Sequence, residues 1–244
     1  NDTELAATVL NTLNGNTDGV INAGTVTTLT GAAAAMNTAY TANAGAGHLT
    51  GLGNEIATIN DTALAATVLN TLNSNTDGNV NVASITGNLS GDAADVKTAL
   101  TTAGIINRGG LNVSIGNNHN LTQLQAINNA TTGTITLSNS GQALSGGAAA
   151  ANEALNGIAG YTGDITLNDT ELSATVLNTL NGRTDGVIDA GTVTTLTGAA
   201  SALNTAYAAN AAAGHLTGLG NEAVTLSDTE LAATVLNTLN GNTD

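Results

Sequence analysis

Pairs of carboxylates recur along the chain at one spacing, and general acid–base chemistry uses paired carboxylates. The pairs are Asp2/Glu4, Asp169/Glu171 and Asp228/Glu230. Each pair precedes a run with helical periodicity, where an acidic side chain caps a helix and offsets its dipole. An enzyme needs one site, whereas this pair returns in each well-preserved copy of the sequence. The spacing therefore predicts helix capping, no catalytic residue is assigned, and the chain is not expected to be an enzyme.

The segment 14–25 has oxygen-bearing side chains at a spacing typical of a calcium loop. Such a loop, as in EF-hands, needs oxygen ligands at positions 1, 3, 5, 9 and 12, with a glycine at position 6. The first four positions would be filled by Asn14, Asn16, Asp18 and Asn22. Calcium is therefore a candidate cofactor, the only one that the sequence offers.

Two features weigh against calcium. Position 12 is Thr25, which lacks a bidentate carboxylate, and Arg183 replaces Asn16 in a near-identical second copy of the loop. Asp185 and Asp189 add negative charge to that copy but leave the arginine in place. The favoured interpretation is an Asn-Gly turn that ends a helix, followed by an Asp-Gly turn into a strand.

The other reactive residue types form no recognisable site. His48 and His215 occupy the same position of two repeats, and no histidine or carboxylate lies beside them at the spacing of metal ligands. We expect both, like His119, to be turn or surface residues. The glycine-rich connection from Gly45 to Gly53 contains no phosphate-binding fingerprint. No metal site is predicted.

Repetition dominates the organisation of the chain. Residues 1–59 and 168–226 align without a gap and differ at only ten positions, and further copies start at Asn60 and Ser227. The sequence predicts one continuous array over 1–244, which reads as a window of a longer one: repeats 1–59 and 168–226, a divergent repeat 60–115, a degenerate repeat 116–167 and a partial repeat 227–244. Repetition at this length is typical of solenoids.

Each repeat is predicted to contain two strand–helix passes. The apolar residues Leu5, Val9, Leu10 and Leu13 form a one-sided helical stripe, which Asn14-Gly15 would end with a left-handed residue. A second helix after Thr30 would place Ala32, Ala35, Met36, Ala39 and Tyr40 on one face. In the central part we expect helices over 61–72, 92–102, 121–129 and 147–156, and strands over 79–85, 111–115, 133–137 and 164–167.

Strands that alternate with helices favour parallel pairing through right-handed crossovers. The predicted fold is therefore an α/β solenoid of strand–helix coils, with a parallel β ladder on one side and a row of helices on the other. Its core must be aliphatic, because the chain has no Phe, Trp or Cys and only three Tyr. The alternative is a parallel β-helix, in which Asn-, Thr- and Gly-rich coils are common.

Charge excludes two classes of partner. The net charge is −15 with only three Lys and Arg residues, so there is no basic surface to bind nucleic acid. No apolar run approaches the roughly 20 residues that a membrane-spanning helix needs, so membrane insertion is not expected.

Three phrases carry a resemblance to a known class of protein: DTELAATVLNTL at 228–239, GTVTTLTGAA at 191–200 and GLGNEAVTL at 218–226. They resemble the repeats of giant cell-surface and secreted proteins of marine cyanobacteria, the class that includes a very large protein needed for non-flagellar swimming. The resemblance is close over the two 59-residue copies and the final fragment, moderate over 60–115 and weak over 116–167. It implies an extracellular, elongated, acidic protein with a structural, adhesive or motility role.

Two functions remain open at this point. The first is a structural segment of a long fibre, whose partners are further copies of the repeat, in cis or by end-to-end assembly. The alternative is an adhesin that engages glycans or cell surfaces, with calcium in a possible supporting role. Its candidate region is the divergent stretch 105–130, with Arg108, Asn117, Asn118, His119 and Asn120.

Overall fold

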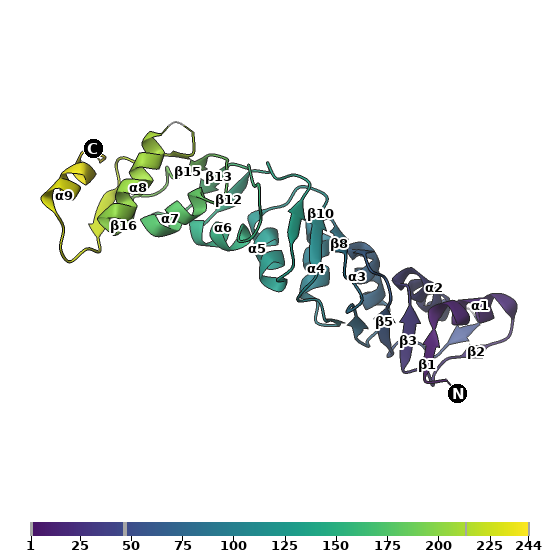
Figure 1. The fold of residues 1–244 in the computed structure, drawn as a ribbon. Coiled ribbons are helices and arrows are strands. Elements are labelled where there is room, and N and C mark those ends of the chain that lie inside the picture. The colour runs from purple at the N-terminus through teal and green to yellow at the C-terminus, as the bar shows by residue number, and fades with distance from the viewer. Residues whose placement is uncertain (1, 46–47, 213, 244) are drawn as a thin grey trace. The chain divides into compact units, whose positions relative to one another are not determined.

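The structure, a computed structural model, describes residues 2–45, 48–212 and 214–243, in which helices alternate with short strands (Figure 1). Residues 46–47 of the glycine-rich connection therefore lie outside the described residues. All strand pairs in the described residues are parallel. The α/β solenoid is confirmed, and the helices in its coils distinguish it from a β-helix.

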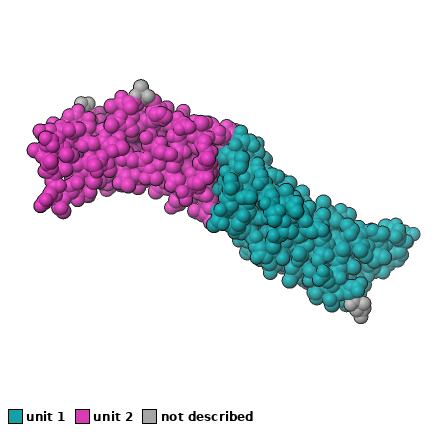
Figure 2. Space-filling model, viewed as in Figure 1, with its two compact units in different colours: residues 1–117, 130–138 teal, residues 118–129, 139–244 magenta. Residues whose placement is uncertain are grey.

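The chain divides into two compact units, which Figure 2 colours separately. Unit 1 comprises residues 1–117 and 130–138, and unit 2 comprises residues 118–129 and 139–244. The sequence predicted one array over both.

Helices of similar length begin at similar intervals along the described chain. They are α1 (Ala7–Asn16), α2 (Ala33–Ala44), α3 (Ala66–Ser74), α4 (Ala93–Thr101), α5 (Leu121–Ala130), α6 (Ala148–Ala154), α7 (Ala174–Asn181), α8 (Ala200–Ala211) and α9 (Ala233–Asn240). Most begin with alanine, which is fully buried in α2, α3 and α7. A small first residue lets the helix approach the coil that follows.

The strands of unit 1 form three parallel sheets. The first contains β1 (Glu4–Ala6), β3 (Thr28–Gly31), β5 (Ile56–Ile59), β7 (Val80–Asn81) and β9 (Ile105–Ile106), in that order. The second contains β11 (Ile135–Leu137), β10 (Asn112–Ile115), β8 (Asn88–Gly91) and β6 (Leu64–Ala65). The third pairs β2 (Ile21–Asn22) with β4 (Leu49–Thr50).

Unit 2 has two parallel sheets. One contains β12 (Leu144–Gly146), β13 (Ile165–Leu167), β15 (Ile188–Asp189) and β17 (Leu216–Thr217). The other contains β14 (Glu171–Ser173), β16 (Thr195–Gly198) and β18 (Ala223–Leu226).

Some strands connect two ranks of the solenoid, and we call them switch strands. A leading strand runs directly into a helix, as β3 does, and a trailing strand follows a helix, as β7 does. The switch strand β5 pairs with β3 on one side (Leu29↔Ala57) and with β7 on the other (Ala57↔Val80). β10 and β13 are switch strands in the same sense. Sheets therefore pass from one rank to the other at these strands.

The core is a thin aliphatic layer between helices and strands. Ala66, Leu69 and Leu72 of α3 are fully buried, and Leu29 and Leu196 of the strands that lead into α2 and α8 are buried as completely. Burial of one such leucine contributes about 1.5–3 kcal/mol. Many small layers of this kind replace the single large core of a globular domain.

The predicted helix starts and ends are partly wrong. Residues 4–6 form strand β1, and α1 begins only at Ala7, because the ladder pairs Glu4 with Thr28. Gly182 and Gly241 follow their helices in right-handed conformation, with φ of −82° and −80°, so the predicted left-handed end is also wrong. The strand expected over 79–85 is only β7. By contrast, α5 begins at the predicted residue.

Candidate functional site

The possible calcium ligands have local structural roles. In the described residues no group of three or more His, Cys, Asp or Glu side chains lies close enough together to hold a metal ion. Asn22 and Asp189 each accept the backbone N–H two residues ahead through Oδ1, at 2.9 Å. Asn16, Asp18 and Asp185 are exposed, whereas Asn14 is half-buried on α1.

Arg183, which stands where the first copy has Asn16, joins two coils. Its Nε donates to Asn152 Oδ1 at 3.1 Å, and its Nη1 donates to Asn156 Oδ1 at 3.0 Å. Both acceptors lie in the preceding coil, so the cation that argued against calcium has a structural use.

The same loop contains a buried hydrogen-bond arrangement that we call the Thr-x-Gly turn. Thr184 is 5% exposed, and its hydroxyl donates to the carbonyl oxygen of Gly163 at 2.9 Å and accepts the N–H of Gly186 at 2.9 Å. A hydroxyl can do both at once. A Cβ at Gly186 would lie 2.4 Å from the Gly163 oxygen, so the turn requires glycine for close approach.

Thr-x-Gly turns recur in unit 1. Thr76 donates to Gly53 O at 3.0 Å, and a Cβ at Gly78 would lie 2.0 Å from Glu55 O. Residues Thr131 and Gly133 repeat the arrangement on Leu111 O, at 2.7 Å and 2.2 Å respectively. In the first coil, Thr17 and Gly19 form the turn with their own 2.9 Å hydrogen bond but are exposed.

An asparagine ladder joins successive helices. The fifth residue of a helix donates its amide to the third carbonyl oxygen of the next helix, at 2.8–3.1 Å. The bonds are Asn11 to Ala35, Asn37 to Val68, Asn70 to Asp95, Asn152 to Val176 and Asn178 to Ala202. In α4 and α5 the fifth residues are Lys97 and Gln125. The ladder therefore changes in the divergent part of the chain.

The acidic residues cap helices, but not the helices that follow them. The carboxylate of Asp169 accepts the N–H of Ala148, the first residue of α6, at 2.7 Å. Asp61 and Asp228 do the same for α2 and α8 at 2.7 Å, and Asn117 caps α4 at 3.0 Å. The prediction of capping is correct in kind but wrong in the helix capped, since each residue reaches back to the preceding coil.

Replacement of Asp169 by alanine is expected to lower the free energy of unfolding by about 1 kcal/mol, the usual value of a helix cap. Asp169→Asn should retain most of that stability, because Asn117 performs the same role at α4. Asp2→Ala is the matched control, since the equivalent carboxylate of the first coil is exposed. Urea denaturation of the three variants measures the difference, and equal midpoints for Asp169→Ala and Asp2→Ala would contradict the assignment.

A buried tyrosine–glutamate pair fixes the connection that follows α2. The Tyr40 hydroxyl donates to Glu55 Oε2 at 2.9 Å, and the Glu55 carboxylate also accepts the N–H of Gly53 at 2.8 Å. Glu55 is only 2% exposed. In the second copy, Glu222 accepts the N–H of Gly220 at 2.7 Å. The sequence reasoning missed both glutamates, although each follows a glycine-rich segment at the same place in its repeat.

Burial makes the three tyrosines hard to ionise. Burial first, and Glu222 second, raise the pKa of Tyr207 to about 12. Burial also raises the pKa of Tyr40 and of Tyr161 above the ordinary value.

We therefore expect an alkaline unfolding transition. The raised pKa values favour the neutral phenols in the folded state, so their contribution to stability is complete below pH of about 10, the pKa of an unfolded tyrosine. It is lost as the pH rises from there through the folded pKa values. Phenolate absorbance and helical circular dichroism should change together in one titration. Phenolate formation near pH 10 with the helical signal intact would contradict this.

Side chains of the divergent stretch hold the fold together. In unit 1, the Arg108 guanidinium donates to the carbonyl oxygens of Leu100 and Ile105, and Asn117 caps α4. In unit 2, Asn118 accepts from Asn139, and Asn120 forms a reciprocal capping box with Gln123 at the start of α5. These residues are thereby engaged within their own units.

The three histidines divide into two kinds. His48 and His215 are exposed in turns, as predicted. His119 is only 4% exposed, and its ring makes a tilted contact with that of Tyr161 at a centroid distance of 6.2 Å. The prediction of a surface position is wrong for His119, because the short loop before α5 turns it into the core of unit 2.

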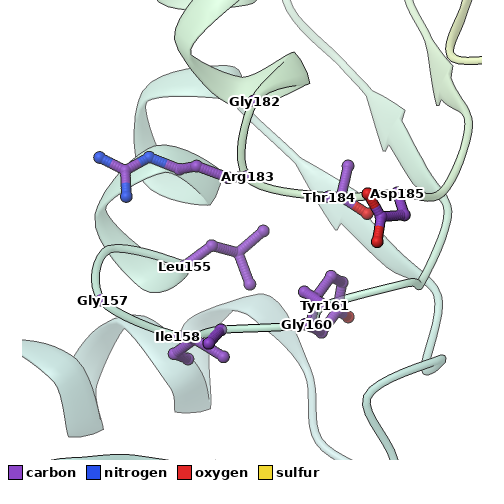
Figure 3. A pocket seen from close by; sticks show the side chains of 10 residues that line it. Leu155, Gly157, Ile158, Gly160, Tyr161, Gly182, Arg183, Thr184 and Asp185 are labelled. Atoms are coloured by element: carbon purple, nitrogen blue, oxygen red, sulfur yellow. The ribbon is translucent and has the colours of Figure 1, made fainter.

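A pocket of about 260 Å³ lies in unit 2, between the segment that follows α6 and the segment that follows α7 (Figure 3). The glycines Gly157 and Gly160 have φ of +77° and +67°, and they form an irregular loop in the coil with the shortest described helix. Tyr161 and Asp185 lie on one side, and Arg183 extends to the other (Figure 3). The lining offers a cation and a carboxylate but no pair of groups arranged for nucleophilic or acid–base chemistry.

Comparisons with known proteins add no identification. No protein-family model, no curated protein and no solved structure matches the chain. Within the described residues, no helix has the length and apolar character needed to cross a membrane. The function is therefore inferred from the contacts between coils.

Proposed function

We propose that this chain is a non-catalytic structural segment of a long extracellular fibre or giant cell-surface protein. The observation that carries the proposal is the repetition of the same contacts between successive coils. Thr-x-Gly turns, the asparagine ladder and backward-reaching caps recur in both units. Such contacts serve stacking, whereas a reaction would require one distinctive site.

The energetics of the repeat fit a mechanical role. Each coil bonds to its neighbours, so the stability of a repeat array grows approximately as a sum of coil and interface terms. Length can then increase by addition of coils without a larger core. The net charge of −15 keeps a long polymer soluble and limits lateral association.

The location and partners belong to the same proposal. The resemblance of the repeats to those of giant cell-surface and secreted proteins supports an extracellular place and a role in adhesion or motility. Further copies of the repeat, in cis or end to end, are the proposed partners.

Electron microscopy of native-length material, with and without a calcium chelator, tests this function. Uniform filaments one chain wide with a regular axial repeat are expected in both conditions. Compact discrete particles would contradict the fibre. Disassembly by the chelator would restore calcium as a cofactor at Asn14, Asn16, Asp18, Asn22, Asp185 and Asp189.

An adhesin-like binding module is the second candidate, and the pocket beside Tyr161 is the observation that favours it. A glycan array probed with the chain and with Arg183→Ala tests it. A signal that the substitution removes would support binding at the pocket. Silence of both proteins across the array would remove this candidate.

A further inference from the structure

We infer that the first coil of a second copy of this chain docks on β18 and takes the place of residues 227–244. This inference names the partner and the contact within the proposed fibre, and it rests on that proposal. It follows from three observations: a duplicated segment, an incomplete sheet edge and an unused Thr-x-Gly turn.

The duplicated segment makes the exchange possible. Residues 1–18 and 227–244 are identical except that Asn1 corresponds to Ser227. The incoming segment therefore presents the same side chains to α8 as the resident one does. Asp2, for example, would cap α8 in place of Asp228, whose carboxylate now accepts the N–H of Ala200 at 2.7 Å.

The sheet edge shows what the incoming coil adds. β18 occupies the same place in its repeat as the switch strand β5, which pairs with β3 and also with the trailing strand β7. Within the described chain, β18 pairs with β16 alone. The second copy would bring its β2 to the open side and pair Ile21 with Val224 and Asn22 with Thr225. Leu226, 36% exposed here, would then be covered like its counterpart Ile59, which is 2% exposed.

The exposed Thr-x-Gly turn of the first coil fits the same edge. Thr76 binds the carbonyl oxygens of Gly53 and Glu55, which correspond to Gly220 and Glu222 just before β18. Thr17 of the incoming copy would bind those two carbonyls in the same way.

Apolar burial favours docking as well. Leu13 of α1 is 47% exposed, whereas its counterparts Leu72 and Leu180, which have a preceding coil, are fully buried. Docking supplies that preceding coil, and burial of a leucine is worth about 1.5–3 kcal/mol when complete.

The resident segment is weakly held. Of the residues of α9 only Leu239 is buried, whereas the equivalent helix α3 buries Ala66, Leu69 and Leu72. Displacement of α9 therefore sacrifices little, and the incoming coil restores the same contacts with α8 while adding a strand pair and a Thr-x-Gly turn.

Sedimentation velocity over a concentration series of the full chain tests the inference. The unmodified chain should form dimers and longer species as its concentration rises. Gly19→Val should weaken association at least tenfold, because internal counterparts of Gly19 lie where a Cβ would be 2.0–2.4 Å from a carbonyl oxygen. In the free chain a Cβ at Gly19 meets only its own Thr17 Oγ1 at 3.2 Å, so the monomer should stay folded. Gly19→Ala repeats the test without a branched side chain.

Two further variants separate this contact from others. Gly15→Ser should associate normally, since Ser74 stands at the equivalent position of α3. Leu236→Asp should also associate, because this half-exposed residue lies on the displaced segment. Loss of association in Leu236→Asp would place the contact on the outer face of α9 and overturn the inference. A monomeric unmodified chain, or full association of Gly19→Val, would overturn it too, while the filaments of native-length material would still test the proposed function separately.

Discussion

A single methyl group at Gly186 or Gly78 is expected to lower the free energy of unfolding by about 3 kcal/mol, at the upper end of the usual cost of overpacking. The added Cβ would lie 2.4 Å from Gly163 O at the first position and 2.0 Å from Glu55 O at the second. Each obstacle is backbone that also takes part in the contact between coils. The coils must therefore move apart, and the bonds of Thr184 or Thr76 weaken with them.

Chemical denaturation of Gly186→Ala and Gly78→Ala measures this loss. Gly19→Ala is the matched control, because it occupies the same place in a Thr-x-Gly turn with no coil against it. Its stability should equal that of the unmodified chain. If all three variants unfold at the same denaturant concentration, close approach between coils does not decide stability.

The size of this effect bears on the proposed function. In an array stabilised by nearest neighbours, a weakened interface divides the molecule into parts that unfold separately. We therefore expect Gly78→Ala to broaden or split the unfolding transition of unit 1, which a globular domain of similar stability would not show. A fibre built from such coils depends on each of its interfaces.

The sequence alone predicted the architecture because the pattern repeats. Alternating strand and helix signals indicated parallel coils, and the stripe that contains Leu10 and Leu13 indicated a helix. The start of α5 at Leu121 was predicted correctly. These features depend on periodicity within a few residues, which local sequence determines.

The contacts between coils were not predicted, since each joins residues more than twenty positions apart. Asp169 looks like a cap for the helix that follows it but bonds to Ala148 instead. The loop around Asp18 resembles a calcium site because Thr, Asp and Gly recur there. In the structure the threonine and glycine make the contacts, as in Thr184 and Gly186. The recurrence of Thr-x-Gly in four coils was the available signal.

The buried carboxylate of Glu55 gives the second large effect expected in this protein. Glu55→Ala should lower the free energy of unfolding by about 3 kcal/mol, because it leaves the Tyr40 hydroxyl and the Gly53 N–H buried without their acceptor. Glu55→Gln should cost less, since one oxygen remains to accept. Glu4→Ala, on an exposed strand residue, is the control for loss of a carboxylate.

Thermal and urea denaturation of these variants would show whether the pair fixes the coil. Glu55 stands directly before the switch strand β5, and its own carbonyl oxygen accepts from Thr76 at 3.3 Å. A shift at Glu55 therefore reaches the Thr-x-Gly turn, and the double variant Glu55→Ala with Gly78→Ala should lose less stability than the sum of the two single changes. Strict additivity would mean that the two contacts act independently, and that the coil interface has no common centre at β5.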